Sequence, residues 1–280
     1  MEIQISGRTI KNSLPALIMG IVNVTDDSFY SESRGGFALA QKLIDEGADI
    51  IDLGAESTRP GSTYVSADEE IKRLVPVIRE IRKYSSVPIS VDTRKYSVMK
   101  AMREEGADIL NDVSALLDEP LLADFCAKEN LGVILMHKRG NPENMQNDTQ
   151  YSDVFKEVDD FLRKRAEFAI ERGINEKNII VDPGIGFAKD EKACLSLVSK
   201  CGSLCDGRFP VLMALSRKSF LARFSRHSSA QGRLVPTVTA NLLSVQAGAK
   251  IVRVHDVSSA VESLSVLGAI CDFGTKIEKN

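Results

Sequence analysis

Polar side chains suited to binding a small molecule stand where short apolar runs end. Eight such runs follow one another, and each is followed at once by charged, amide or hydroxyl residues. The runs lie at residues 20–22, 50–53, 88–91, 109–110, 133–136, 179–181, 211–213 and 251–252. After them, Asp92, Asp182 and Asn111 would offer acceptors to a heterocycle edge that bears N–H groups. Lys218 would offer a cation to an exocyclic oxygen of the same ring.

A second set of residues has the chemistry of an anion site. Arg59, Arg253 and His255, with Asn23, would supply charge and donors suited to phosphate, which arginine binds through two parallel N–H groups. No His-x-His pair, Cys pair or carboxylate-rich cluster indicates a tight transition-metal site. Any metal is therefore expected to be magnesium, held partly by a bound diphosphate.

Each of these residues also has a purely structural interpretation. A carboxylate after a strand often caps the next helix, and this interpretation is favoured for Asp92 or Asp182 taken alone. Arg253 would then pair with Asp92 inside the protein. Several such groups in one place weaken the capping interpretation, because buried charges need partners.

The elements that must position these residues are those of a parallel barrel. Polar residues repeated at strand ends are typical of an α/β fold of the (β/α)8 TIM-barrel type, with its active site at the carboxyl face of the strands. Residues 71–81 have the apolar spacing of a helix, and Pro76 should kink it or mark a shifted start. Residues 154–168 predict a longer helix that ends near Gly173.

A weak internal repeat supports this fold. Residues 46–50, 105–109 and 247–251 each read as a helix end, a glycine turn and a strand start. A doubly wound open sheet is the alternative, but the Gly-x-Gly-x-x-Gly turn expected after its first strand is absent. No linker or composition shift divides the 280 residues, so we expect one domain over residues 1–280. The loops at 25–36 and 55–68 are rich in polar residues and are expected to cover the site.

Composition excludes several classes of partner. The net charge is −3 with both signs interspersed, so no basic field would recruit nucleic acid. No run of about 18 apolar residues could span a membrane, and the start does not resemble a signal peptide. The five cysteines are irregularly spaced, which favours reduced thiols in a cytoplasmic protein.

Eight strings of residues, in order from about residue 18 to 257, resemble dihydropteroate synthases. They read GIVNVTDDSF at 20–29, ESTRPG at 56–61, SVDT at 90–93, NDVS at 111–114, MH at 136–137, DPGIGF at 182–187, SRKSF at 216–220 and RVHD at 253–256. The resemblance implies a folate-synthesis transferase that joins p-aminobenzoate to 6-hydroxymethyl-7,8-dihydropterin diphosphate and releases diphosphate. It also implies magnesium as cofactor and a homodimer formed through the late helices, near 238–247 and 259–270.

Roles for individual residues are implied by the same resemblance. The residues implied in pterin binding are Asp92, Asn111, Met136, Asp182, Phe187, Lys218 and Arg253. Those implied in p-aminobenzoate binding are Phe29, Thr58, Arg59, Pro60 and Ser216. Those implied in diphosphate binding are Asn23, Arg59, Arg253 and His255, with Asn23 also a magnesium ligand. Asp27, Arg253 and His255 would take part in catalysis, Asp27 by stabilising a cation or accepting the amine proton.

The chain departs from the family pattern at a few positions. Asp26 replaces a common Pro, Ala55 and Ala188 stand where Gly is frequent, and Lys138 stands where Met is common. A pterin-binding barrel without synthase activity, like that of corrinoid methyltransferases, is the alternative function. It would explain the acceptors but leave residues 56–61 and 216–220 without a purpose. A barrel metal hydrolase would need a ligand set that the sequence lacks.

Overall fold

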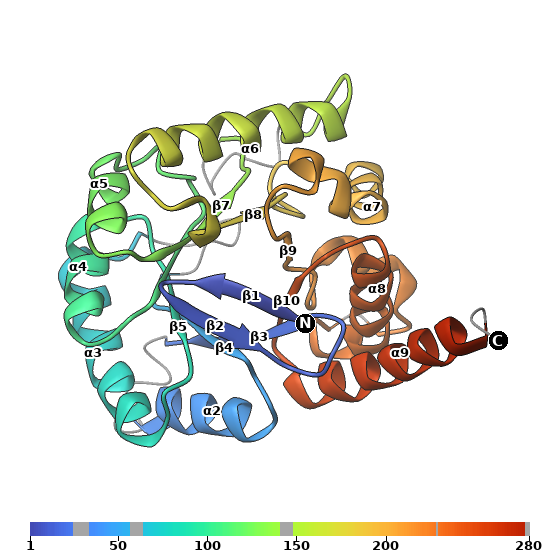
Figure 1. The fold of residues 1–280 in the computed structure, drawn as a ribbon, viewed down its shortest axis with the longest axis horizontal. Helices are drawn as coiled ribbons and strands as arrows, with labels where there is room; N and C mark the ends of the chain where they lie inside the picture. The colour runs from blue at the N-terminus through green and yellow to red at the C-terminus, as the bar shows by residue number, and fades with distance from the viewer. Residues whose placement is uncertain (25–33, 57–63, 141–147, 228, 278–280) are drawn as a thin grey trace.

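Eight parallel strands form one sheet that curls into a barrel, in the order β8-β7-β6-β5-β4-β3-β10-β9. The structure is a computed structural model and describes residues 1–24, 34–56, 64–140, 148–227 and 229–277. The strands are β3 (Leu17–Asn23), β4 (Ile50–Gly54), β5 (Ile89–Asp92), β6 (Ile109–Asp112), β7 (Gly132–Met136), β8 (Ile179–Asp182), β9 (Leu212–Met213) and β10 (Ile251–Val254). A bridge between Val181 and Val211 joins the two ends of this order. The predicted (β/α)8 barrel is confirmed (Figure 1).

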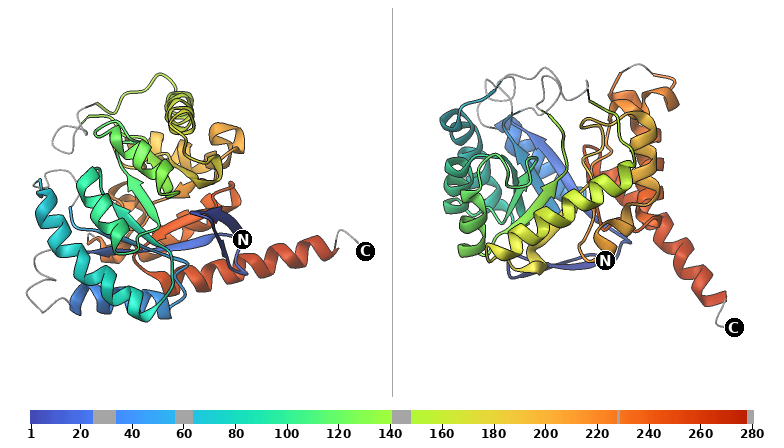
Figure 2. Two further views of the ribbon diagram at one scale, coloured as in Figure 1. Left: turned by 60° about the vertical axis from the view of Figure 1, so that its left-hand side comes forward. Right: turned by 90° about the horizontal axis from the view of Figure 1, so that it is seen from above.

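Helices surround the strands on the outside of the barrel (Figure 1). They are α2 (Arg34–Asp45), α3 (Ala67–Tyr84), α4 (Tyr96–Glu104), α5 (Leu121–Lys128), α6 (Val154–Glu171), α7 (Glu191–Ser199), α8 (Leu234–Gln246) and α9 (Val257–Ile277). Short 3-10 turns lie at Glu176–Asn178, Cys201–Gly207, Ser219–Phe224 and Gln231–Arg233. Figure 2 shows α9 extending beyond the barrel. Among the described residues, no helix has the length and apolar character needed to cross a bilayer.

Helix α3 shows how local sequence defines an element. Ser66 caps its start by accepting a hydrogen bond from the Glu69 N–H at 3.3 Å, and acidic residues fill the first turn. The helix begins at Ala67 and contains Pro76 in its interior, so the shifted start predicted at Pro76 is wrong. Burial of the apolar face on both sides of the proline offsets the hydrogen bond that proline cannot donate. That face includes Leu74, Val77, Ile78 and Ile81.

The repeated glycine turn is present at all three predicted joints. Gly47, Gly106 and Gly248 have φ of +100°, +100° and +110°, which side chains disfavour. The Gly47 N–H donates to the Ile44 carbonyl and the next N–H donates to the Leu43 carbonyl, which is the Schellman pattern. Gly173, with φ of +92°, ends α6 in the same way, as predicted.

Two apolar cores hold the barrel together. The larger lies between the strands and the helices and includes Ile51, Leu53 and Val91. The smaller lies inside the barrel and includes residues from several strands, among them Ile50 of β4 and Ile109 of β6. Because side chains alternate between the two faces of a strand, neighbouring residues of β4 enter different cores.

A hairpin covers the amino-terminal end of the barrel. Its strands β1 (Glu2–Ile5) and β2 (Arg8–Lys11) pair antiparallel and lie across that end in Figure 1. Ile5 belongs to the interior core, and a Cβ at Gly132 would lie 2.5 Å from its side chain, so β7 needs glycine there. The hairpin therefore completes the barrel floor and leaves the carboxyl face for the polar groups.

Candidate active site

The side chains that point into the barrel change from apolar to polar between one layer and the next. Ile50, Ile109 and Ile251 belong to the interior core. Two residues further along the same strands stand Asp52, Asn111 and Arg253, which have the same inward orientation because strand periodicity is two. By the same spacing, the inward residues near the other strand ends are Asn23, Asp92, Met136, Asp182, Ser216 and His255. These inward side chains thus face the barrel mouth above an apolar floor and are called the polar layer below, with His255 one step beyond Arg253 on β10.

Arg253 lies at the centre of the polar layer. Its Nε donates to Asp52 Oδ2 at 2.6 Å, and a terminal N–H donates to Asp92 Oδ2 at 3.1 Å. Asp52 is fully buried and also accepts from the Asn111 amide at 3.3 Å. One guanidinium therefore joins β4, β5 and β10, and Asp52 connects it to β6.

The electrostatics of this cluster follow from burial. Burial raises the pKa of Asp92 to about 7, against the opposing effect of the Arg253 cation. Burial disfavours the Arg253 cation, but the Asp52 and Asp92 carboxylates outweigh this and raise its pKa. The guanidinium therefore stays charged, while Asp92 titrates near neutral pH.

A second part of the layer joins the ends of β8 and β9. Asp182 Oδ1 accepts from the Gly184 N–H at 2.7 Å, and burial raises its pKa. Lys218 Nζ donates to the Ile185 carbonyl and lies 4.8 Å from the centre of the Phe187 ring. Burial lowers the pKa of Lys218 to about 8, although Asp182 opposes this. An acid and a cation thus lie beside an aromatic wall.

Ser216 and His255 form a pair between β9 and β10. The Ser216 hydroxyl lies 2.9 Å from His255 Nδ1 and accepts from the His255 backbone N–H at 3.2 Å. Next to them, the Arg217 side chain donates twice to the Asp256 carboxylate, at 2.7 and 3.2 Å. This two-point ion pair holds the two strand-end loops together.

The structural interpretations of the strand-end residues have different outcomes. Helix capping is wrong for Asp92 and Asp182, because Lys95 precedes α4 and the cap of α7 is Asp190. Internal pairing of Arg253 with Asp92 is observed. In this structure the arginine therefore occupies an acceptor that was expected to face a heterocycle.

The chemistry of Asn23 fits a weakly held magnesium ion. Asn23 ends β3, is exposed, and lies in register with Gly54 of β4. In the described ranges no group of three or more His, Cys, Asp or Glu side chains is placed to hold a metal. A single amide oxygen suits Mg²⁺, which commonly takes only one or two protein ligands besides phosphate and water oxygens.

Some predicted site residues lie outside the described residues. They are Asp27, Phe29, Thr58, Arg59 and Pro60. The loops predicted at 25–36 and 55–68 both end earlier than expected, because α2 already begins at Arg34 and α3 at Ala67.

Two buried charged residues beside the site were not predicted from the sequence. Asp52 stands inside an apolar run rather than after it, and its signal was the two-residue spacing from Ile50. Lys189 lies two residues after the DPGIGF string, directly after Ala188, and is 4% exposed. Its three nearest partners come from the loops after β7 and β8.

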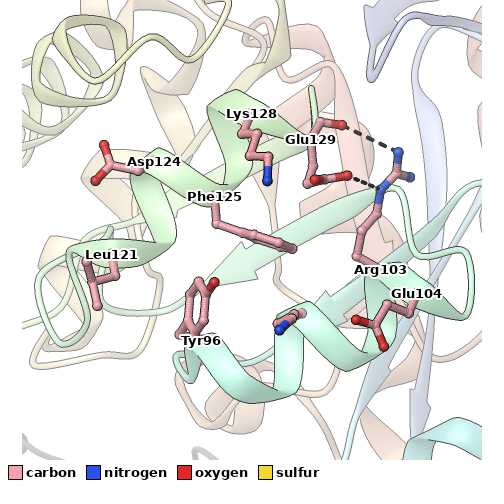
Figure 3. Close-up of a pocket in the computed structure, with 9 residues that line it drawn as sticks. Tyr96, Arg103, Glu104, Leu121, Asp124, Phe125, Lys128 and Glu129 are labelled. Atoms are coloured by element: carbon pink, nitrogen blue, oxygen red, sulfur yellow. Dashed lines mark hydrogen bonds and ion pairs between the residues drawn. The ribbon is translucent and has the colours of Figure 1, made fainter.

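A separate pocket of about 700 Å³ lies between α4 and α5 on the outside of the barrel (Figure 3). Tyr96 and Phe125 meet edge to face there, with ring centres 5.4 Å apart. Arg103 crosses its end to pair with Glu129. None of its lining residues belongs to the strand-end layer.

Comparison with known proteins places this geometry in a family. The family model described as pterin binding enzyme matches residues 19–255. The dihydropteroate synthase of Bacillus subtilis (strain 168) is 40% identical over 263 residues, which cover 92% of this chain and 90% of that protein. The chain belongs to the dihydropteroate synthase family. Members of this family are transferases, so the chain is an enzyme of that class.

Solved structures of the family agree in fold. Xanthomonas albilineans dihydropteroate synthase with 4-aminobenzoic acid is 37% identical, with a TM-score of 0.88 over 96% of this chain and 97% of that one. The same enzyme in complex with 7,8-dihydropteroate is 34% identical, with a TM-score of 0.85 over 96% and 98%. The family assignment and the barrel fold predicted from the sequence are both confirmed.

Asp52 is expected to stabilise the folded barrel through Arg253. Replacing the buried Asp52 by Ala should lower the free energy of unfolding by about 3–5 kcal/mol, because the partly buried guanidinium loses one of its two carboxylate partners. Urea denaturation of Asp52→Ala against Glu171→Ala, an exposed carboxylate on α6, measures this. A loss below about 0.5 kcal/mol, the size expected of a surface change, would contradict it.

Proposed function

We propose that this enzyme condenses 6-hydroxymethyl-7,8-dihydropterin diphosphate with p-aminobenzoate to give 7,8-dihydropteroate and diphosphate. The observation that carries the proposal is the polar layer itself. Three acceptors, Asp92, Asn111 and Asp182, lie in one barrel mouth with the cations of Lys218 and Arg253. The family membership and the ligands named for the Xanthomonas albilineans structures support it.

The pterin is proposed to bind deepest in the mouth. Asp92 and Asp182 would accept from its 2-amino group and ring N–H, while Lys218 would bind its 4-oxo group and a ring nitrogen. Met136 and Phe187 would line the slot, and Arg253 would stack on the ring after leaving Asp92. A wrong ring would leave buried polar groups unpaired, which makes such recognition selective.

The diphosphate is proposed to leave from beside Asn23, Arg253 and His255. Arg253 and His255 would bind the charge that the leaving group gains as its bond to the pterin methylene breaks. Mg²⁺, when bound through Asn23, would supply further charge neutralisation there. The methylene carbon would become cation-like before the amine attacks it, and Asp27 would stabilise that cation or accept the amine proton.

The p-aminobenzoate is proposed to bind nearer the rim. Ser216, held by His255 at 2.9 Å, would contact it together with Phe29, Thr58, Arg59 and Pro60. Sulfonamides resemble p-aminobenzoate and are expected to compete for the same place.

The assay that tests this function is formation of dihydropteroate from the two substrates, with magnesium and with chelator. We expect magnesium-dependent turnover with release of diphosphate. Asp182→Asn and Lys218→Ala should each weaken pterin binding by about 2–5 kcal/mol, the range for removing one partner of a buried hydrogen-bonded contact that involves a charge. Unchanged affinity in both variants would reject the site. Binding of the pterin diphosphate without product would instead favour a pterin-binding barrel that lacks synthase activity.

The raised pKa of Asp92 predicts how pterin affinity depends on pH. Below about pH 7 the Asp92 carboxyl is protonated and offers fewer acceptors to the pterin N–H groups. Affinity is therefore expected to increase as pH rises from about 6 to 8. Calorimetric titration at several pH values measures this, and Asp92→Asn is expected to bind more weakly and to show a smaller rise. An equal rise in both proteins would assign the titration to another group.

We also propose that the enzyme is a homodimer formed through α8 and α9. These helices lie side by side (Figure 1), and their outer surface carries exposed apolar side chains. They include Val235 and Leu243 of α8, and Val266, Ile270 and Phe273 of α9, each more than half exposed. Apolar side chains gathered in this way are typical of association surfaces.

Light scattering at micromolar concentration tests the dimer. The mass is expected to be about 61 kDa, twice the 30.6 kDa of the chain. Val266→Asp combined with Ile270→Asp should shift it toward the monomer, because charges are poorly tolerated in an apolar interface. Leu121→Asp, at an exposed leucine of α5, is the matched control. A monomeric mass for the unmodified protein would reject the proposal.

A further inference from the structure

A buried lysine beside the pterin slot has no role in the steps above. Lys189 follows β8 and is 4% exposed. Its Nζ lies 2.9 Å from His137 Nδ1, 2.9 Å from the Phe187 carbonyl and 3.0 Å from the Gly184 carbonyl. The His137 carbonyl lies further away, at 3.4 Å. The lysine therefore connects the loop after β7 with the loop after β8.

The chemistry of these contacts makes Lys189 a fixed internal group. An ammonium has three N–H donors, and the three acceptors within 3.0 Å use all of them. Burial lowers the pKa of Lys189 to about 7. In its ammonium form Lys189 cannot accept a hydrogen bond, so its contact with His137 Nδ1 then requires that nitrogen to be the acceptor. Burial, followed by the Lys189 charge, lowers the pKa of His137 to about 3, which keeps the ring neutral. Lys189 then has no donor left for a substrate, so it acts on the site through other residues.

The turn that Lys189 holds has an unusual backbone. Gly184, Gly186 and Ala188 have φ of +65°, +83° and +52°, all in the left-handed region. A Cβ at Gly184 would lie 1.9 Å from the His137 carbonyl oxygen, so the two loops touch directly. The two glycines adopt this region readily, whereas it is disfavoured for Ala188 and persists there because the surroundings hold it. The ammonium supplies such a constraint because it binds two carbonyls of the turn.

The same turn carries groups of the proposed pterin slot. The Gly184 N–H donates to Asp182 Oδ1 at 2.7 Å, which orients that carboxylate. The Ile185 carbonyl accepts from Lys218, and the Phe187 ring lies 4.8 Å from the Lys218 ammonium. A shift of the turn would therefore move an acceptor, a cation and an aromatic wall together.

We propose that Lys189 is a positioning residue of the pterin slot. Its bonds to His137, Gly184 and Phe187 fix the turn that orients Asp182 and Phe187. The identity of the ligand rests on the proposed function. None of the residues assigned to p-aminobenzoate lies in this turn, so the effect of Lys189 is expected mainly on the pterin.

The test compares Lys189→Met, which keeps the chain length and removes the ammonium, with Lys192→Met, an exposed lysine of α7. We expect the KM for the pterin diphosphate to rise at least about tenfold in Lys189→Met, since small misplacements of binding groups have effects of this size. The KM for p-aminobenzoate should stay within about twofold. Lys192→Met should match the wild type.

A second variant keeps the inference testable where Lys189→Met does not fold. His137→Phe retains a ring against Phe161, whose centre lies 4.8 Å away, and removes the acceptor Nδ1. A smaller rise, about threefold, is expected in the pterin KM alone. In either variant, a pterin KM within twofold of wild type would overturn the inference. Equal rises for both substrates would also overturn it, because they indicate a general effect on the fold.

Failure of the proposed function gives a different result from failure of the inference. If the wild type forms no dihydropteroate, the synthase function fails. The same variants are then compared by calorimetry with the pterin diphosphate as the ligand. A tenfold weaker affinity in Lys189→Met supports the positioning role, and equal affinities reject it.

Discussion

In the mouth of the barrel, the Arg253 guanidinium donates to the buried Asp52 carboxylate and to the partly buried Asp92 carboxylate, which belong to different strands. Three acidic side chains, Asp52, Asp92 and Asp182, stand in this layer, where water cannot fully compensate their charge. Arg253 and Lys218 are the cations beside them. Without these cations the acids would be neutral or the layer would be unstable, because isolated buried charges are strongly disfavoured.

The position of the charge cluster depends on the apolar layer below it. Ile50, Ile109 and Ile251 fill the barrel interior, and the next inward residues on the same strands, Asp52, Asn111 and Arg253, meet above them. The outer core locks each strand against its helices, and the glycine turns return the chain to the correct strand start. The polar groups are therefore positioned by strands rather than by flexible side chains, which is what preorganised recognition requires.

Much of this arrangement could be predicted from the sequence, for a physical reason. A buried parallel strand must be apolar, and a polar residue at its end is exposed to the mouth, so all eight strands and most strand-end residues were predictable. Asp52 was missed because it interrupts an apolar run, where only the inward spacing from Ile50 reveals it. The pairing of Arg253 with both Asp52 and Asp92 needed four strands in register, β10, β3, β4 and β5. Lys189 was missed because its partners, His137 and Gly184, lie in two different loops.

The hairpin of β1 and β2 has a consequence for the order of events. It covers the amino-terminal end of the barrel, and Ile5 packs into the interior beside Gly132. Because the hairpin closes the amino-terminal end, small molecules enter and leave the barrel at the carboxyl face. Under the proposed function, the pterin at the depth of Asp92 and Asn111 would enter before the p-aminobenzoate at the rim, which would then close the way out. The closed end of the barrel would thereby set the order in which the two substrates enter.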